Sequence, residues 1–329
     1  MKKNYNLAIA AAAAALMLSA CGGGGGGDSA SGTAASGNSG SNTTSASTGN
    51  VTTPTYSASS AQLAVFNTIN SRRQACGFPA LTENTVLDTA AQAHAAYMGA
   101  NGGTVTDSEV SGNSGFTGVT YSDRAVKAGF PASAVVGGMS AGFYTNSTLT
   151  EADYGEQIAA EWLSGVYHSA LVDMPVTQIG VGWNELQYNG FPEIQSSVTI
   201  ASLQTMTGNL PLTYPCEGTT DVPYQVVGES PTPPNTSGAW GPAISVGANP
   251  TDTIRMTSGT LTDTSGNVIA MQVLDSSTDT SGVIKAYEGR AYPAVALSKN
   301  TTYTATVYGT TNGVAFTRTF SFTTGTKVG

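Results

Sequence analysis

The fold is decided by one stretch, residues 161–183, which is EWLSGVYHSALVDMPVTQIGVGW. Its first part continues a helical pattern that begins at Thr150 and is predicted to run to about His168. Its last part, VTQIGVGW (176–183), alternates as a β-strand does, and SSVTIASLQTM (196–206) repeats that pattern. The stretch therefore predicts a long helix followed by two antiparallel strands. It also holds one of the chain's two histidines, His168, so we ask whether that side chain performs chemistry.

Further helices are predicted before this stretch. One covers residues 57–77, where one helical face carries Leu63, Phe66, Ile69 and Arg73, and a second covers residues 82–102. A short helix with Ser122 as its cap follows over 122–130, and a short strand over 132–143. Helices and strands in this mixed order predict an α+β fold, with helices packed on a small sheet.

The composition changes after Leu210 and divides the chain into predicted domains. The α+β domain covers residues 57–210, and residues 211–241, dense in Pro, Gly and Thr, form a connector. Residues 242–326 contain short alternating segments and an Asn312-Gly313 turn, which favours a β-hairpin. They predict an all-β sandwich of about 85 residues.

The N-terminus predicts export. Residues 1–20 have the charged start and short apolar run of a signal peptide, and residues 18–21, Leu-Ser-Ala-Cys, form a lipobox. The pattern resembles that of bacterial lipoproteins. The resemblance implies that Cys21 is lipidated, palmitate included, and anchors the protein to a membrane, at the outer membrane or the cell surface. Residues 21–56 are predicted to be a flexible Gly/Ser/Thr-rich linker.

The net charge indicates which partners the protein does not bind, and the cysteines predict a disulfide. The formal charge is −9, and removal of residues 1–20, with two Lys and no acidic residue, would make it −11. An acidic chain without a basic run argues against nucleic-acid binding. With Cys21 lipidated, Cys76 and Cys216 remain, and in an oxidising compartment we expect them to form a disulfide rather than stay as two unrelated thiols.

Residues 57–207 resemble the CAP superfamily, the SCP-like domain of cysteine-rich secretory, antigen 5 and pathogenesis-related 1 proteins. The resemblance is carried by an ordered set of segments: VFNTINSRRQACGFPAL, LDTAAQAHAAYM, EVSGNSGFTGVTYSDRAVKAGF, GGMSAG, AEWLSGVYH and TQIGVGW. It implies an α-β-α sandwich. Residues 242–326 more weakly resemble bacterial Ig-like domains, which commonly act as spacers or adhesive units.

The CAP resemblance implies a cavity with two His and two Glu that binds a divalent metal in some members. In this chain Asp107 stands at the first His position, Met139 at the first Glu, Ser164 after the helix Trp162, and Val176 at the second His of animal members. Ser164 and His168 nearly match the Ser-x-x-His motif of bacterial members, with one extra residue between them. His168 is therefore the only one of the four family residues that this chain clearly keeps. A site of His168, Asp107 and Glu161 would be weak, and we expect no metal and no cofactor.

Nucleophilic catalysis has equally little support. Ser164 and His168 are four residues apart on the predicted helix and could meet, but a helix interior offers no oxyanion hole. Glu156 and Glu161 are five apart and face different ways. We interpret His94, on an apolar stripe, as a core histidine, and Trp162 as a core or cavity-wall residue. No catalytic residue is assigned.

Three functions stay open. The first is a non-enzymatic binding module, lined at its cavity by Met139, His168 and Trp162, for an apolar ligand or a protein partner. Lipid and sterol binding enter only as roles that the CAP resemblance implies. The second is a hydrolase of cell-envelope material with His168 as base. The third is a structural adhesin or spacer.

Overall fold

The computed structural model describes residues 49–329. The predicted signal peptide, Cys21 and most of the predicted linker lie outside these residues. Among the helices that are described, none is long and apolar enough to cross a membrane.

A four-stranded sheet in the order β1-β3-β4-β2 forms the centre of the N-terminal part. Its strands are β1 (Thr82–Glu83), β2 (Val136–Tyr144), β3 (Val176–Tyr188) and β4 (Phe191–Leu203). β3 and β4 form the predicted antiparallel hairpin, and β2 pairs antiparallel with β4. Asn189 and Gly190 have φ of 51° and 82°, the left-handed conformations that a tight hairpin turn requires.

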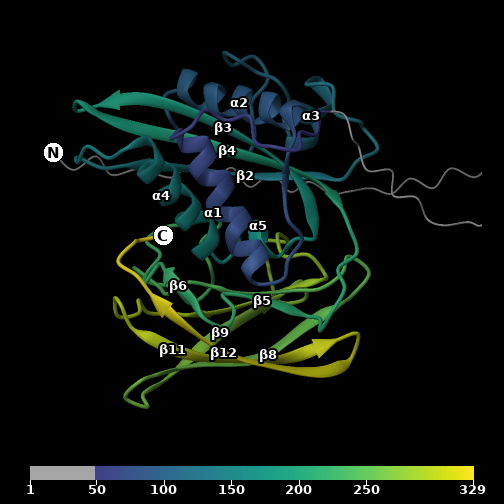
Figure 1. Cartoon of the computed structure of the whole chain (residues 1–329), viewed down its shortest axis with the longest axis vertical. Helices are drawn as coiled ribbons and strands as arrows, with labels where there is room; N and C mark the ends of the chain where they lie inside the picture. The colour runs from purple at the N-terminus through teal and green to yellow at the C-terminus, as the bar shows by residue number, and fades with distance from the viewer. Residues whose placement is uncertain (1–48) are drawn as a thin grey trace, which may run out of the picture. The chain divides into compact units, whose positions relative to one another are not determined.

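Helices cover both faces of this sheet (Figure 1). They are α1 (Ala61–Ala75), α2 (Thr85–Ala100), α3 (Tyr121–Lys127), α4 (Glu151–Ser164) and α5 (Ala170–Asp173). α1 and α4 pack through Phe66, Ile158 and Trp162 against one face, and α2 and α3 pack through Leu87 and Ala125 against the other. The N-terminal part is therefore the α-β-α sandwich that the sequence predicts.

Two glycines of the TQIGVGW stretch permit this packing. A Cβ atom on Gly180 would overlap the backbone of Leu87 and Asp88, and one on Gly182 would overlap the backbone of Ala91 and Gln92. Only residues without a side chain let α2 lie so close to β3. The G-V-G spacing thus fixes the contact between helix and sheet.

The boundaries of two predicted helices are wrong. α3 begins at Tyr121, and its cap is Thr120 rather than Ser122, because Thr120 and Asp123 form a reciprocal capping box. α4 ends at Ser164 and not at His168, because Gly165 is extended, with ψ of 153°. His168 therefore lies in the turn between α4 and α5.

The predicted linker boundary is also wrong at its C-terminal end. The amide of Val51 donates to the Glu83 carbonyl at 3.1 Å, and the Tyr56 hydroxyl donates to Asp88 at 2.6 Å. Residues that the composition assigned to the linker 21–56 are thus hydrogen-bonded to β1 and α2. Their polar composition hid this role, since the contacts are made by backbone and hydroxyl groups.

The C-terminal part is one eight-stranded sheet in the order β5-β7-β10-β9-β8-β11-β12-β6. Its strands are β5 (Leu212–Tyr214), β6 (Thr219–Val222), β7 (Ile244–Gly247), β8 (Ile254–Asp263), β9 (Val268–Asp275), β10 (Glu288–Pro293), β11 (Thr302–Thr311) and β12 (Val314–Thr324). β9 pairs with β8 through one half and with β10 through the other, and the residues between the strands form one apolar core. An Ig-like assignment stays a prediction.

The predicted connector 211–241 is not only a connector. It supplies both edge strands, because β5 pairs with β7 and β6 pairs with β12. It also carries Cys216, which forms the predicted disulfide with Cys76 at the end of α1, with Cα atoms 5.5 Å apart. Strands of three and four residues were too short for their alternation to be detected.

The two parts share a buried interface. Arg290 of β10 forms an ion pair with Asp173 of α5, with Nη1 and Oδ2 2.5 Å apart and both side chains fully buried. Nε of Arg290 also donates to the Val166 carbonyl at 2.8 Å. Around them lies an apolar cluster drawn from both parts, which consists of Val166, Tyr167, Val226, Trp240, Ala243, Leu274, Ile284 and Tyr292. We therefore expect the two parts to unfold together.

We predict that loss of the disulfide destabilises the whole chain. Cys76 and Cys216 are 140 residues apart, so the bond restricts the unfolded chain strongly. The double variant Cys76→Ser/Cys216→Ser should lose about 2–5 kcal/mol of unfolding free energy, measured by urea denaturation. Wild-type protein in reducing buffer should match the variant, and an unchanged urea midpoint would contradict the prediction.

We predict that Asp173→Asn uncouples the two parts. The substitution leaves the buried Arg290 charge with only the Glu288 carboxylate, 3.5 Å away, as an ionic partner, and loss of one partner of a buried ion pair costs up to about 3–5 kcal/mol. Calorimetry should show one transition for wild type and a lower, broadened or split transition for the variant. As a control, Arg255→Gln removes the 3.9 Å ion pair with Asp275 from its 45 % exposed side and leaves the interface intact. Equal effects of the two substitutions would refute the proposed coupling.

Candidate functional site

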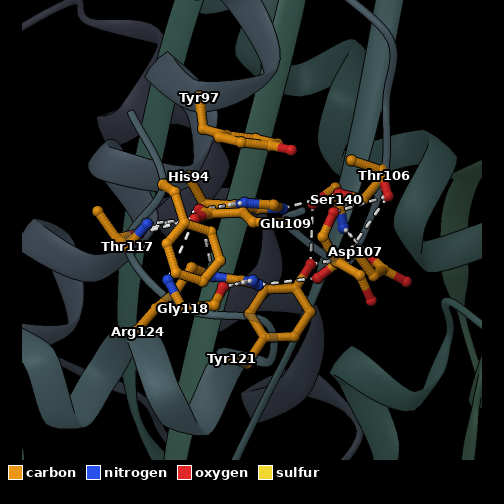
Figure 2. Close-up of polar contacts among 12 residues, drawn as sticks. His94, Tyr97, Thr106, Asp107, Glu109, Thr117, Gly118, Tyr121, Arg124 and Ser140 are labelled. Atoms are coloured by element: carbon orange, nitrogen blue, oxygen red, sulfur yellow. Dashed lines mark hydrogen bonds and ion pairs between the residues drawn. The ribbon is translucent and has the colours of Figure 1, made fainter. Parts of the chain in front are cut away.

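The loop between α2 and α3 is organised by one buried carboxylate, that of Glu109 (Figure 2). It accepts hydrogen bonds from the amides of Thr117 at 2.5 Å and Gly118 at 3.2 Å, and from the Thr117 hydroxyl. Its Oε1 lies 3.0 Å from Nδ1 of His94 and 3.9 Å from Nε of Arg124. A buried carboxylate needs such partners, and here they close the loop on itself.

His94 is the core histidine that the sequence predicts. Its side chain is fully buried, and Nε2 donates to the Thr106 carbonyl at 2.7 Å. Burial, followed by the charge of Arg124, lowers the pKa of His94. Because Nδ1 faces Glu109 and Nε2 faces Thr106, neither nitrogen has a lone pair directed at open space for a metal.

Arg124 holds the same loop from α3. Its guanidinium donates to the carbonyls of Gly118, Val119 and Asp107 at 3.2, 3.1 and 2.9 Å. It also lies 4.3 Å from the centre of the Tyr121 ring. Arg124 is 1 % exposed, so it acts as a support of the loop and not as a group that meets a ligand.

Asp107, at the position of the family's first His, joins the loop to β2. Its Oδ1 accepts from the Tyr121 hydroxyl at 2.7 Å and from the Ser140 amide at 3.0 Å. The Tyr121 hydroxyl lies 2.8 Å from Oγ of Ser140 (Figure 2). The structure thus brings Asp107 beside the Met139-Ser140 segment of β2, where the residue is exposed and its contacts fix the loop.

His168 is held by a residue that the sequence analysis missed. Nδ1 of His168 lies 2.7 Å from Oε1 of Glu229, a buried residue of the predicted connector. The same carboxylate accepts from the amides of Val166, Tyr167 and His168, each at 2.8 Å. Three successive amides directed at one carboxylate form an anion-binding nest. Glu229 is the one charged residue between Asp221 and Asp252, which is the signal that could have revealed it.

The charge on His168 depends on these neighbours. Burial opposes protonation, but the hydrogen bond and the charge of Glu229 outweigh it, and Asp107 and Glu161 act in the same direction, so the pKa of His168 is raised. Within the described residues Nε2 of His168 has no hydrogen-bond partner, and the side chain is 20 % exposed. His168 is thus an oriented, partly accessible imidazole.

The other predicted cavity residues do not join it. Oγ of Ser164 donates to the Ala160 carbonyl at 2.7 Å and not to His168, so the possible Ser164–His168 pair does not form. Met139 and Trp162 lie in the apolar core, 6 % and 1 % exposed. Glu161 accepts from Gln157 at 3.3 Å, and burial raises its pKa to about 8.

The donor set does not fit a metal ion. Among residues 49–329, no group of three or more His, Cys, Asp or Glu side chains is placed to hold one. Glu109 and His94 are engaged with each other, and His168 is engaged with Glu229. The arrangement instead presents a fixed loop, residues 104–120, and one oriented imidazole.

We predict that the His168–Glu229 pair makes stability depend on pH. The pKa of His168 is above its ordinary value near 6.5 in the folded protein, so the pair stabilises the fold below pH 6.5. This contribution is lost as the pH rises through the folded pKa. The stability difference between wild type and His168→Asn should therefore shrink from pH 6 to pH 8.5, measured by urea denaturation.

Comparison with wild type and with Glu229→Gln shows whether the pH dependence comes from His168. Asp88 and Glu161 have pKa values raised to about 7 and about 8, so only the difference between the variant and wild type reports on His168. Glu229→Gln removes the charge that faces the imidazole and should reduce the same pH dependence. A difference that stays constant over this pH range would show that His168 is not ionised in the fold.

A family comparison agrees with this geometry. Residues 66–200 match CAP, the Cysteine-rich secretory protein family. The match covers the sheet β1–β4, all five helices in part or in full, and the loop around Glu109. No curated protein matches the chain in a sequence search. Domains of this family are typically extracellular or secreted. Residues 66–200 are thus a CAP domain of the cysteine-rich secretory protein family, and the typical location of such domains is consistent with a place at the cell surface.

Proposed function

We propose that this protein is a lipid-anchored envelope protein whose CAP domain is a non-enzymatic binding module for a protein partner. The anchor would be Cys21, on the strength of the lipobox at residues 18–21. The extracellular character of CAP domains agrees with that placement. The proposal for the binding surface rests on one observation, a set of exposed valines on the loop that Glu109 fixes.

Exposed apolar side chains gather along this loop and the helix after it. Val105, Val110, Val119 and Val126 are 41, 62, 48 and 42 % exposed. Val110 and Val119 are close to each other, because the Glu109 amide donates to the Val119 carbonyl at 3.3 Å. Exposed apolar residues grouped on one segment are typical of surfaces that bind other proteins.

The loop is held in one conformation by the buried network below it. The Val110 amide donates to the Tyr97 hydroxyl at 2.9 Å, and the Val119 carbonyl accepts from Arg124 at 3.1 Å. A segment that is already ordered loses little entropy when a partner binds. The buried charges of Glu109 and Arg124 therefore serve binding indirectly, by fixing the valines.

A protein partner fits better than a small apolar ligand. Met139 and Trp162, expected to line an apolar cavity, are buried in the core. Two hollows at the surface of the described residues have volumes of about 250 and 450 Å³, and neither is lined by Met139, Trp162 or His168. A bound lipid or sterol would need the core to open at this point.

A second candidate is a hydrolase of cell-envelope material. It is favoured by the geometry of His168, whose Nδ1 is fixed by a carboxylate while Nε2 has no partner in the described residues. A carboxylate that orients a histidine in this way is a common feature of general-base sites. The buried Ser164 cannot be its nucleophile, so the hydrolase would have to use a water molecule.

Charge substitutions in the valine loop test the binding proposal. We predict that Val110→Asp/Val119→Asp lowers capture of a partner from a solubilised envelope extract at least tenfold, measured by crosslinking and mass spectrometry. The thermal midpoint should not change, because both side chains point to solvent. As matched controls, Val268→Asp and Val314→Asp alter valines that are 64 and 72 % exposed in the C-terminal part.

The outcomes separate the three functions. Loss of capture only in the loop variant supports the CAP surface. Loss only in the C-terminal variants contradicts it and favours an adhesin that acts through residues 242–326. Release of soluble fragments from cell-wall polymer by the wild type, abolished in His168→Ala, would replace the binding proposal with the hydrolase.

A further inference from the structure

A second hollow lies where the CAP domain meets the C-terminal part. Its volume is about 450 Å³, within the ~300–1,000 Å³ typical of small-molecule sites. α1 and α4 form one wall, and residues of β5, β6 and the chain near its C-terminal end form the other. The lining residues are Thr68, Ser71, Arg72, Glu156, Ala160, Leu163, Tyr214, Asp221, Pro223, Thr326 and Lys327.

The cleft contains one unpaired charge of each sign. Within the described part of the chain, the Arg72 guanidinium and the Asp221 carboxylate form no hydrogen bond and no ion pair. The other two charged groups, Lys327 and Glu156, neutralise each other at 2.6 Å. Arg72 and Asp221 are therefore the charges left for a ligand.

Asp221 adopts a left-handed backbone conformation. Its φ is 55°, in the left-handed region that residues other than Gly, Asn and Asp rarely adopt. The conformation is held from both sides, because the Gly325 amide donates to the Val222 carbonyl at 2.8 Å and Cys216 is bonded to Cys76.

The chemistry of the cleft defines the ligand class. A guanidinium binds a carboxylate through two parallel hydrogen bonds, and an aspartate binds an ammonium group. Ala160, Leu163, Pro223 and the ring of Tyr214 supply an apolar wall for a small side chain. We propose that this cleft is a binding site for a short peptide with free ends, held by Arg72 at its carboxylate and by Asp221 at its ammonium.

The proposed peptide site does not depend on the proposed function. None of the exposed valines of the loop lines the cleft, and Val105 lies instead beside Gly142 of β2. A peptide in the cleft would touch both the CAP domain and the C-terminal part. Its binding should therefore also stabilise the junction between them.

Capped and uncapped dipeptides test the proposal on the full chain. The probes are Ala-Ala and Gly-Leu with free ends, the same peptides with an N-acetyl group, and the same peptides with a C-terminal amide. Titration calorimetry should show that at least one uncapped dipeptide binds, and that each cap weakens its binding at least tenfold. No binding of either uncapped dipeptide, or equal binding of the capped forms, overturns the proposal.

Variants assign each end of the peptide to one residue. Arg72→Gln should remove the preference for a free carboxylate and keep the preference for a free amine. Asp221→Asn, which tolerates the left-handed backbone, should do the reverse. Lys285→Gln, an exposed cation that does not line the cleft, is the matched control. Thermal unfolding of each variant verifies its fold. Preferences that both substitutions leave unchanged would show that the peptide binds elsewhere.

Discussion

The turn from α5 into β3, residues 171–176, is the constraint on which the rest of the structure depends. Arg73 of α1 is fully buried and donates to the carbonyls of Leu171, Val172 and Met174 at 2.9, 3.0 and 2.9 Å, and to that of Val176 at 2.9 Å. Burial lowers its pKa to about 9, so it stays charged at neutral pH. From the other side, Arg290 binds the Asp173 side chain. One turn thus fixes α1, β3 and β10 relative to one another.

Two buried carboxylates fix segments near the surface in the same way, by binding backbone groups. Glu109 closes the loop before α3, and Glu229 closes the turn after α4. Each accepts backbone amides that would otherwise lack partners, and each also faces a histidine. Where the CAP resemblance implied acidic and histidine ligands for a metal, this chain uses the same residue types to satisfy its own backbone.

Part of the site could be predicted because it depends on local pattern. The apolar stripe of the second helix correctly placed His94 in the core. Arg73 already stood on the apolar face of the first helix, where a charged residue needs buried partners. Glu229 could not be predicted in the same way, because its partners are backbone amides 61–63 residues away. Ser164 and His168 were expected on one helix because helical spacing does not show where Gly165 ends it.

By itself the sequence determined which faces of the segments are apolar and which cysteines remain to form a bond. These properties follow from side-chain size, periodicity and chemical type, and each is complete within a short segment. Only the tertiary structure decided that the predicted connector would supply two strands, the carboxylate that binds His168, and one wall of the cleft beside Arg72. These roles depend on which distant backbone amides and charges come together, and burial sets their energies only after the chain has folded.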